Sequence, residues 1–358
     1  MQQQREDIAR RPVHAQGCPA SYNLKLPYCQ PVPNTAAIKP DTADPTDSAM
    51  LRVDSVIRER LSSRVALIDQ ISHYIISAGG KRIRPRLVLL FSEALGFDGP
   101  ERYELAAIVE FIHTATLLHD DVVDESALRR GRATANAMFG NAASVLVGDF
   151  LYSRAFQMMV GVNRMRVLQV LADATNVIAE GEVLQLMNMH DPDLAVADYL
   201  QVIRYKTAKL FEASARLGAV LAGADVALEE SCASYGRSLG TAFQLVDDLL
   251  DYEGNSSELG KNVGDDLREG KPTLPLLLAM ERASKPDRAL IRHAIEHGEL
   301  QKLPDILTIV RSTGALDATR EAAQAEADQA RAVLAHLPPS RAREALLDLC
   351  ARSIYRSS

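Results

Sequence analysis

The chain has 358 residues, 47% of them hydrophobic and 24% charged, a composition typical of a globular protein with a sizeable core. Its formal net charge of −7 argues against a nucleic-acid binder, because such proteins usually present a basic face. No run of about 18 uninterrupted apolar residues predicts a transmembrane span. The four cysteines form no CxxC pair and the first residues show no signal-peptide pattern, so we expect a cytoplasmic protein with reduced thiols.

The sequence changes character at about residue 48. Residues 1–48 hold seven of the sixteen prolines and no sustained apolar periodicity, so we expect a disordered or loosely attached extension. Residues 49–358 place apolar side chains at helical spacing along most of their length. We therefore predict one all-α domain, a bundle of long antiparallel helices.

The first helices of this domain lead into a basic segment. Apolar spacing predicts two helices before the Gly79–Gly80 pair and a third helix that starts near Pro85. Four basic residues stand at the start of the third helix: Lys81, Arg82, Arg84 and Arg86. Because the helix dipole disfavours basic side chains there, the cluster predicts a bound anion, although a solvated basic face is the common alternative.

The next helix runs into an acidic segment at residues 116–134 (TLLHDDVVDESALRRGRAT). Asp120 and Asp124 are four residues apart, so they share one face near the C-terminal end of that helix. Carboxylates at this end oppose the helix dipole, and we expect a cation beside them.

The acidic pattern returns later in the chain. Further helices are expected over 142–159, 164–189, 196–223 and 227–252. At the end of the last of these, FQLVDDLLDYEG places Asp247, Asp248 and Asp251 at the same spacing. A charged, Gly-rich loop follows, Pro272 starts another helix, and residues 286–356 predict peripheral helices. No stretch predicts a strand.

The two acidic segments indicate one kind of chemistry. Paired carboxylates without His or Cys partners favour a hard cation, and Mg²⁺ is the natural candidate because it commonly shares its ligands with substrate phosphates. The Lys and Arg side chains nearby are too many for one phosphate group, so we infer two anion sites. Such a protein could join two diphosphate substrates. Metal-assisted loss of diphosphate from one leaves a carbocation that the alkene of the other attacks.

In order along the chain, these motifs resemble those of the trans-isoprenyl diphosphate synthases, most closely the long-chain, octaprenyl type. The resemblance covers roughly residues 50–356. It rests on GGKRIRPRL, FIHTATLLHDDVVDE, RRGRATAN, GDFLYSRAFQMM, EGEVLQL, KTAKLFEA, GTAFQLVDDLLDY and LGKNVGDDLREGKPTLPLL. It implies the isoprenoid-synthase fold, in which the helical bundle surrounds a central cavity.

The resemblance also assigns roles to individual residues. It implies two or three Mg²⁺ ions, through which the protein binds the allylic diphosphate. The ligands of these ions are Asp120, Asp121, Asp124, Asp247, Asp248 and Asp251. Catalysis is assigned to Asp120, Asp121, Asp124, Lys206, Asp247 and Asp248. The allylic diphosphate also contacts Arg129, Lys206, Thr207, Gln244, Lys261 and Lys271. Isopentenyl diphosphate is held by Lys81, Arg84, His113 and Arg130.

Some neighbouring residues have plainer interpretations. Outside the resemblance, the alternative for His113 is a buried core histidine, because it lies within an apolar run. His119 adjoins Asp120 and is expected to be structural. Asp265 and Asp266 form another acidic pair, but they stand in an expected loop and no aspartate follows four residues later, so we expect them to support the structure or to reach a metal through water.

Product length is expected to depend on the first acidic helix. Ala115 and Thr116 lie about one turn, roughly 5 Å, before Asp120, and Ile112 lies about a turn deeper. Short-chain members of the family carry a bulky aromatic residue near the Ala115 position, whereas both residues are small here. We therefore expect a deeper floor on a neighbouring helix. Candidates for this floor are Phe150, Phe156 and Met159.

The implied protein is a Mg²⁺-dependent prenyltransferase. It would add isopentenyl diphosphate repeatedly to an allylic primer, expected to be farnesyl diphosphate, and give an all-trans octaprenyl diphosphate for quinone side chains. A homodimer with at most transient membrane contact is expected. Two alternatives are a class I terpene cyclase and a non-catalytic helical subunit of a heteromeric synthase. The basic residues Lys81 and Arg84 disfavour the cyclase, and two intact acidic motifs disfavour the subunit.

Overall fold

The computed structural model describes residues 45–77, 79–129, 131–253 and 264–355. Most of them are helical, and together they form one unit, which confirms the predicted all-α architecture. The first helix begins at Asp47, two residues before the predicted start of the domain. The expected extension at 1–44 and two expected substrate contacts, Arg130 and Lys261, lie outside the described residues.

The helices follow one another with short connections. In chain order they are α1 (Asp47–Leu61), α2 (Ala66–Ser77), α3 (Ile83–Ala94), α4 (Glu101–Val123), α5 (Ala135–Phe139), α6 (Asn141–Gly161), α7 (Met165–Asn188), α8 (Val196–Ile203), η1 (Arg204–Ala208), α9 (Lys209–Leu221), α10 (Val226–Glu253), α12 (Asp265–Arg268), α13 (Leu274–Arg282), α14 (Lys285–His297), η2 (Leu300–Lys302), α15 (Leu303–Ser312), α16 (Ala315–Leu334) and α17 (Arg341–Ile354). None of these helices is both long and apolar enough to cross a membrane.

One short hairpin was not predicted. Strand β1 (Leu128–Arg129) pairs antiparallel with β2 (Arg132–Ala133) just after α4. Strands of two residues are too short to show an alternating pattern, so the sequence carries no signal for them. The hairpin matters because Arg129 extends from it toward the end of α4.

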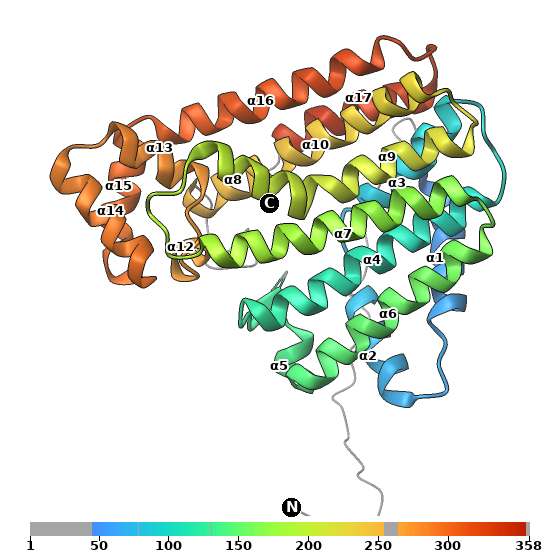
Figure 1. The fold of residues 1–358 in the computed structure, drawn as a ribbon, viewed down its shortest axis with the longest axis horizontal. Coiled ribbons are helices and arrows are strands. Elements are labelled where there is room, and N and C mark those ends of the chain that lie inside the picture. Colours follow the sequence, from blue (N-terminus) through green and yellow to red (C-terminus); the bar gives the residue numbers. More distant parts are fainter. Residues whose placement is uncertain (1–44, 78, 130, 254–263, 356–358) are drawn as a thin grey trace, which may run out of the picture. The chain divides into compact units, whose positions relative to one another are not determined.

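The two acidic helices, α4 and α10, lie in the interior of the bundle, and α9 contacts both (Figure 1). Every residue of α4 from Leu105 to Ile112 is buried, so this helix is covered on all sides. On the outer side of α10, α16 packs along its length through small residues such as Ala323 and Ala327. Both acidic helices are therefore packed against neighbouring helices along much of their length.

A π-helical turn interrupts the helix that was predicted over 196–223. This turn is η1, and it carries Lys206 and Thr207. Two glycines let neighbouring helices approach it closely: a Cβ on Gly181 would lie 2.6 Å from the backbone nitrogen of Lys206, and one on Gly240 would lie 2.7 Å from Cα of Ala208. Isolated π-turns are frequent at functional sites, and here the turn changes which side chains face the interior.

Candidate active site

A cavity of about 710 Å³ lies where the C-terminal ends of α4, α7 and α10 meet η1 and the segment 264–273. Its wall combines carboxylates with basic side chains. The acidic residues are Glu110, Asp120, Asp124, Glu182, Asp247, Asp248, Asp265, Asp266 and Glu269. The basic residues are Lys81, Arg82, Arg84, Arg129, Lys206 and Lys271.

The structure brings Asp120 and Asp124 together on the cavity wall, as their spacing predicts. Each faces an ammonium group. Lys206 Nζ lies 3.8 Å from Oδ2 of Asp120, and Lys271 Nζ lies 3.0 Å from Oδ2 of Asp124. Lys271 therefore joins the first acidic pair, although 147 residues separate it from Asp124.

Asp121 is placed differently from its neighbours. It is fully buried, faces away from the cavity, and accepts a hydrogen bond of 2.8 Å from Nε of Arg129. Consecutive residues of a helix point about 100° apart, which is why Asp121 cannot share the face of Asp120. Burial raises the pKa of its carboxyl group, although the Arg129 guanidinium opposes the shift. Asp121 thus positions Arg129 in this structure, and its role as a metal ligand remains a prediction from the sequence.

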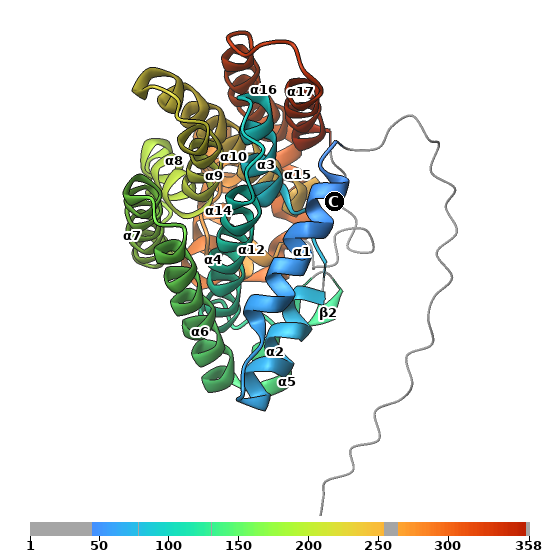
Figure 2. The same ribbon diagram turned by 90° about the vertical axis from the view of Figure 1, so that its right-hand side faces the viewer.

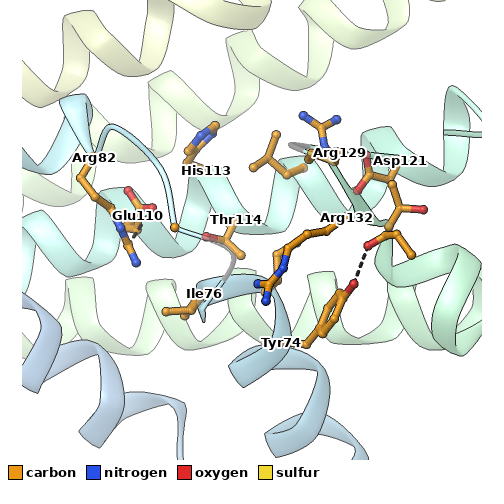
Figure 3. A pocket seen from close by; sticks show the side chains of 14 residues that line it. Tyr74, Ile76, Arg82, Glu110, His113, Thr114, Asp121, Arg129 and Arg132 are labelled. Atoms are coloured by element: carbon orange, nitrogen blue, oxygen red, sulfur yellow. Dashed lines mark hydrogen bonds and ion pairs between the residues drawn. The ribbon is translucent and has the colours of Figure 1, made fainter. Parts of the chain in front are cut away.

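Figure 3 shows Asp121 and Arg129 at one end of a smaller pocket. At the other end of this pocket, Arg82 forms an ion pair of 2.8 Å with Glu110. His113 and Arg129 line both this pocket and the main cavity, so the two spaces adjoin along one side of α4.

The second acidic segment also divides its carboxylates. Asp247 and Asp248 line the cavity, whereas Asp251 is fully buried and does not. Oδ2 of Asp251 accepts a hydrogen bond of 3.3 Å from the backbone N–H of Asp266, and its carbonyl accepts one of 3.1 Å from Gly264. Asp251 therefore holds the segment that carries Asp265 and Asp266 into the cavity wall.

Asp248 is the most constrained of the cavity carboxylates. It accepts hydrogen bonds from the hydroxyl group of Tyr199 at 2.5 Å and from Nε2 of Gln244 at 2.7 Å. Burial raises the pKa of Asp248 to about 7, and the neighbouring Asp266 adds to the rise. Carboxylates crowded in this way are the environment expected of a metal site, because a bound cation would offset their mutual repulsion.

Glu182 and Glu269 of the cavity wall were not singled out from the sequence. Oε2 of Glu182 accepts a hydrogen bond of 2.5 Å from Lys206, and Oε2 of Glu269 lies 2.6 Å from Nζ of Lys271. Burial raises the pKa of Glu182 to about 7, with Lys206 opposing the shift. Both residues lie inside motifs of the family resemblance, EGEVLQL and GDDLREGK, which was the available signal.

The basic side of the cavity centres on Arg84. Its Nη1 donates to Nε2 of His113 at 3.2 Å, and its guanidinium carbon lies 4.4 Å from the ring centre of Phe211. Lys81 shares this side of the cavity. Arg86 points elsewhere, toward Thr46 at the start of α1. The predicted isopentenyl-site residues that the structure describes therefore all reach the cavity.

Of the residues expected to influence product length, Thr116 alone lines the cavity. Ala115 and Ile112 are fully buried in the surrounding core. Met159 belongs to this same core, and the rings of Phe150 and Phe156 pack against it.

The predicted role of His119 is supported by its contacts. Its Nε2 donates to the carbonyl of Val145 at 3.2 Å, and it lies 3.3 Å from Asp149. A Cβ on Gly148 would lie 2.3 Å from the imidazole ring, so glycine leaves the space that the ring occupies. His119 thus joins α4 to α6.

The donor atoms of the cavity suit a hard divalent cation. Asp120, Asp124, Asp247 and Asp248 offer only carboxylate oxygens, which are the ligands that Mg²⁺ prefers. The neighbouring Lys and Arg side chains can bind phosphate oxygens that are shared with such an ion. The residues present therefore fit a site for a metal and a diphosphate.

Comparison with known proteins agrees with this chemistry. The polyprenyl synthetase family model matches residues 65–310. The chain is 54% identical to the octaprenyl diphosphate synthase of Escherichia coli K12 over 312 residues, which cover 87% of this chain and 97% of that protein.

Two solved structures are also similar. A polyprenyl synthase from Caulobacter crescentus CB15, complexed with calcium and isoprenyl diphosphate, superimposes with a TM-score of 0.85 and 48% identity, covering 87% of this chain and 96% of that one. A decaprenyl diphosphate synthase from Rhodobacter capsulatus superimposes with a TM-score of 0.83 and 47% identity, covering 87% of this chain and 97% of that one. Two relatives, at 54% and 47% identity, are thus named for products of different length.

Proposed function

The chain belongs to the polyprenyl synthetase family, and we propose that it condenses isopentenyl diphosphate repeatedly onto an allylic diphosphate to give a long-chain all-trans polyprenyl diphosphate. The enzyme is a trans-prenyltransferase of the long-chain type. Octaprenyl diphosphate is the product we propose, with farnesyl diphosphate as the primer. The greatest support for this product is the 54% identity to an octaprenyl diphosphate synthase.

We assign the allylic diphosphate to the acidic side of the cavity. Asp120, Asp124, Asp247 and Asp248 would hold Mg²⁺, in two or three ions, and the bound metal would stabilise the negative charge of the leaving diphosphate. Asp121 and Asp251 would act indirectly, by positioning Arg129 and the segment 264–266.

Two lysines on this side are positioned to bind the same diphosphate. Lys206 is held between Glu182 and Asp120, and Lys271 is held between Glu269 and Asp124. Ion pairs of this kind keep an ammonium group charged and oriented before the substrate arrives, so less rearrangement is needed on binding. Thr207 and Gln244 share a hydrogen bond of 2.9 Å beside them.

The isopentenyl diphosphate is assigned to the basic side, with Lys81, Arg84 and His113. Phe211 and Phe243 form part of the same cavity wall, with ring centres 5.6 Å apart. Apolar walls of this kind exclude water from a carbocation until the alkene attacks it. The roles expected of Arg130 and Lys261 remain proposals from sequence, since both lie outside the described residues.

The observation that carries this proposal is the single cavity in which an acidic side and a basic side face each other. Its test supplies purified protein with Mg²⁺, farnesyl diphosphate and labelled isopentenyl diphosphate, and sizes the product after dephosphorylation. Octaprenol is expected. Absence of elongation would contradict the function, and cyclic hydrocarbon from the allylic substrate alone would favour the cyclase. Activity only with a second protein would favour the partner subunit.

We also propose a homodimer. Figure 2 shows α6 and α7 along one edge of the helical unit. On these two helices, large apolar side chains are more than half exposed: Leu146, Val160, Met165, Val183, Leu186 and Met187. Exposed apolar groups in such number favour an interface between chains. Light scattering after gel filtration is expected to give twice the chain mass, and Leu186→Glu is expected to shift it toward the monomer.

A further inference from the structure

A second group of metal-ligating side chains lies on α14, away from the cavity. His293, Glu296 and His297 occupy positions i, i+3 and i+4, so they share one side of the helix. One ligand atom from each lies within 4.8 Å of the others, and the two imidazole ring centres are 4.2 Å apart. All three residues are exposed. We propose that they bind one borderline transition-metal ion, with Zn²⁺ as the representative.

The orientation of one ring supports this proposal. Nδ1 of His297 donates a hydrogen bond of 2.9 Å to the carbonyl oxygen of His293. This places the proton of the neutral ring on Nδ1 and leaves the lone pair of Nε2 for a ligand. Metal-bound histidines commonly donate their other nitrogen to a backbone carbonyl in this way, because the bond fixes the ring and its tautomer.

A further carboxylate adjoins the group. Oε2 of Glu299 lies 3.7 Å from Nε2 of His293, and it follows Gly298, whose φ of +64° ends the helix. The C-terminal end of a helix carries partial negative charge, which favours a cation. Arg292 competes for one oxygen of Glu296 at 3.0 Å, but it also binds both oxygens of Asp193. Oε2 of Glu296 is therefore the oxygen we assign to the metal.

The ligand type separates this site from the cavity. Two imidazoles and a carboxylate suit Zn²⁺, Ni²⁺ or Cu²⁺, whereas Mg²⁺ prefers oxygen ligands in an octahedral arrangement. The chain would therefore hold two kinds of metal at once.

The turn beyond His297 touches a segment that reaches the active site. A Cβ on Gly298 would lie 2.6 Å from the carbonyl oxygen of Arg268, and His190 donates from Nδ1 to the carbonyl of Ile295 at 3.0 Å. An ion that joins His293, His297 and the carboxylates would fix this turn. Zn²⁺ is accordingly expected to raise the melting temperature of the full chain.

Calorimetric titration of the full chain with Zn²⁺, at about pH 7.5 where imidazole is neutral, tests the proposal. Excess Mg²⁺ is present throughout to occupy the cavity. One equivalent of Zn²⁺ is expected to bind. We expect the Zn²⁺ affinity to fall about tenfold or more in each of three variants: His293→Gln, His297→Gln and Glu296→Gln. Prenyl transfer with Mg²⁺ alone should stay unchanged in these variants.

His73 offers a matched control. It is an exposed histidine with a carboxylate, Asp69, four residues before it at 3.8 Å, but the group on α14 has a second imidazole that His73 lacks. His73→Gln is expected to leave the titration unchanged. The assignment would be overturned if His293→Gln and His297→Gln bound Zn²⁺ as tightly as the wild type. An unchanged Zn²⁺ affinity in Glu296→Gln would also overturn it.

Discussion

The hydroxyl group of Tyr199 donates a hydrogen bond to Oδ2 of Asp248, and both side chains are buried beside the cavity. The bond restricts Asp248 to one orientation among neighbouring carboxylates. We predict that Tyr199→Phe weakens Mg²⁺ binding about tenfold, because groups that orient a metal ligand have effects of this size. The Mg²⁺ dependence of activity and of the melting temperature measures it.

Tyr235 is the control for this variant. It is fully buried as well, and its hydroxyl group donates to the carbonyl of Leu346 at 2.7 Å, in another part of the core. Tyr235→Phe is expected to lower stability without changing the Mg²⁺ dependence. If both variants shift the Mg²⁺ curve equally, Tyr199 has no specific role in positioning Asp248.

Lys206→Ala should remove an ammonium group that faces Asp120 and Glu182 in the cavity. We predict a loss of about a hundredfold in kcat, because a donor that stabilises charge in the transition state is lost. Lys209→Ala is the comparison, since Lys209 instead pairs with Glu212 at 2.7 Å. Steady-state kinetics with the allylic substrate varied would show the difference, and similar losses in both variants would refute the assignment.

Thr116→Phe is predicted to shorten the product while leaving the chemistry intact. The side chain of Thr116 lines the cavity, so an aromatic ring there would block the path of a growing chain. Thr116→Val keeps the volume and should keep the product length. Chromatography of the dephosphorylated products decides the outcome, and an unchanged length in Thr116→Phe would place the path along another wall.

Ala115→Phe is expected to act by lowering the stability of the fold. Ala115 is fully buried in the core, so a phenylalanine there would overpack it at a cost of about 1–3 kcal/mol. A lower melting temperature is predicted for Ala115→Phe, with any shortening of the product following from displacement of α4. A variant of unchanged stability that shortens the product would show that the path reaches Ala115 after all.

Glu229 is predicted to stabilise the fold above acidic pH. Its carboxylate accepts hydrogen bonds from Arg166 and from Arg216, the latter at 2.9 Å, and so joins α7, α9 and α10. Burial alone would raise the pKa of Glu229, but the two guanidinium groups hold it below its usual value. Since the folded pKa is the lower one, this stabilisation is present above the unfolded pKa and is lost as the pH falls through the folded value.

Glu229→Gln should therefore lower the free energy of unfolding by about 1 kcal/mol at neutral pH. The difference from wild type is expected to shrink as the pH falls below about 4. Urea unfolding at several pH values measures it. A difference that does not depend on pH would mean that the loss comes from packing and not from the charge.

Much of the protein could be read from residues close together in sequence. Apolar spacing gave the main helices, because a helix repeats its contacts every three or four residues. The i, i+4 spacing of Asp120 and Asp124 correctly placed both on one wall of the cavity. The motif order also identified the family that the comparisons show.

The tertiary structure decided which side of each buried helix meets the cavity. From Leu105 to Ile112, α4 is buried all round, so apolar periodicity could not distinguish a face against the core from a face toward the substrate. For the same reason the sequence could not show that Asp121 turns away toward Arg129, or that Asp251 supports Asp266.

Contacts between distant segments decided the remainder. Tyr199 meets Asp248, Glu182 meets Lys206, and Lys271 meets Asp124 only because α4, α7, α8, η1, α10 and the segment 264–273 converge on one cavity. No local spacing encodes such meetings. The sequence by itself determined the helices, the acidic repeats and the family, since these depend on neighbours along the chain. The arrangement of charges in the site came from packing between helices, which only the folded chain defines.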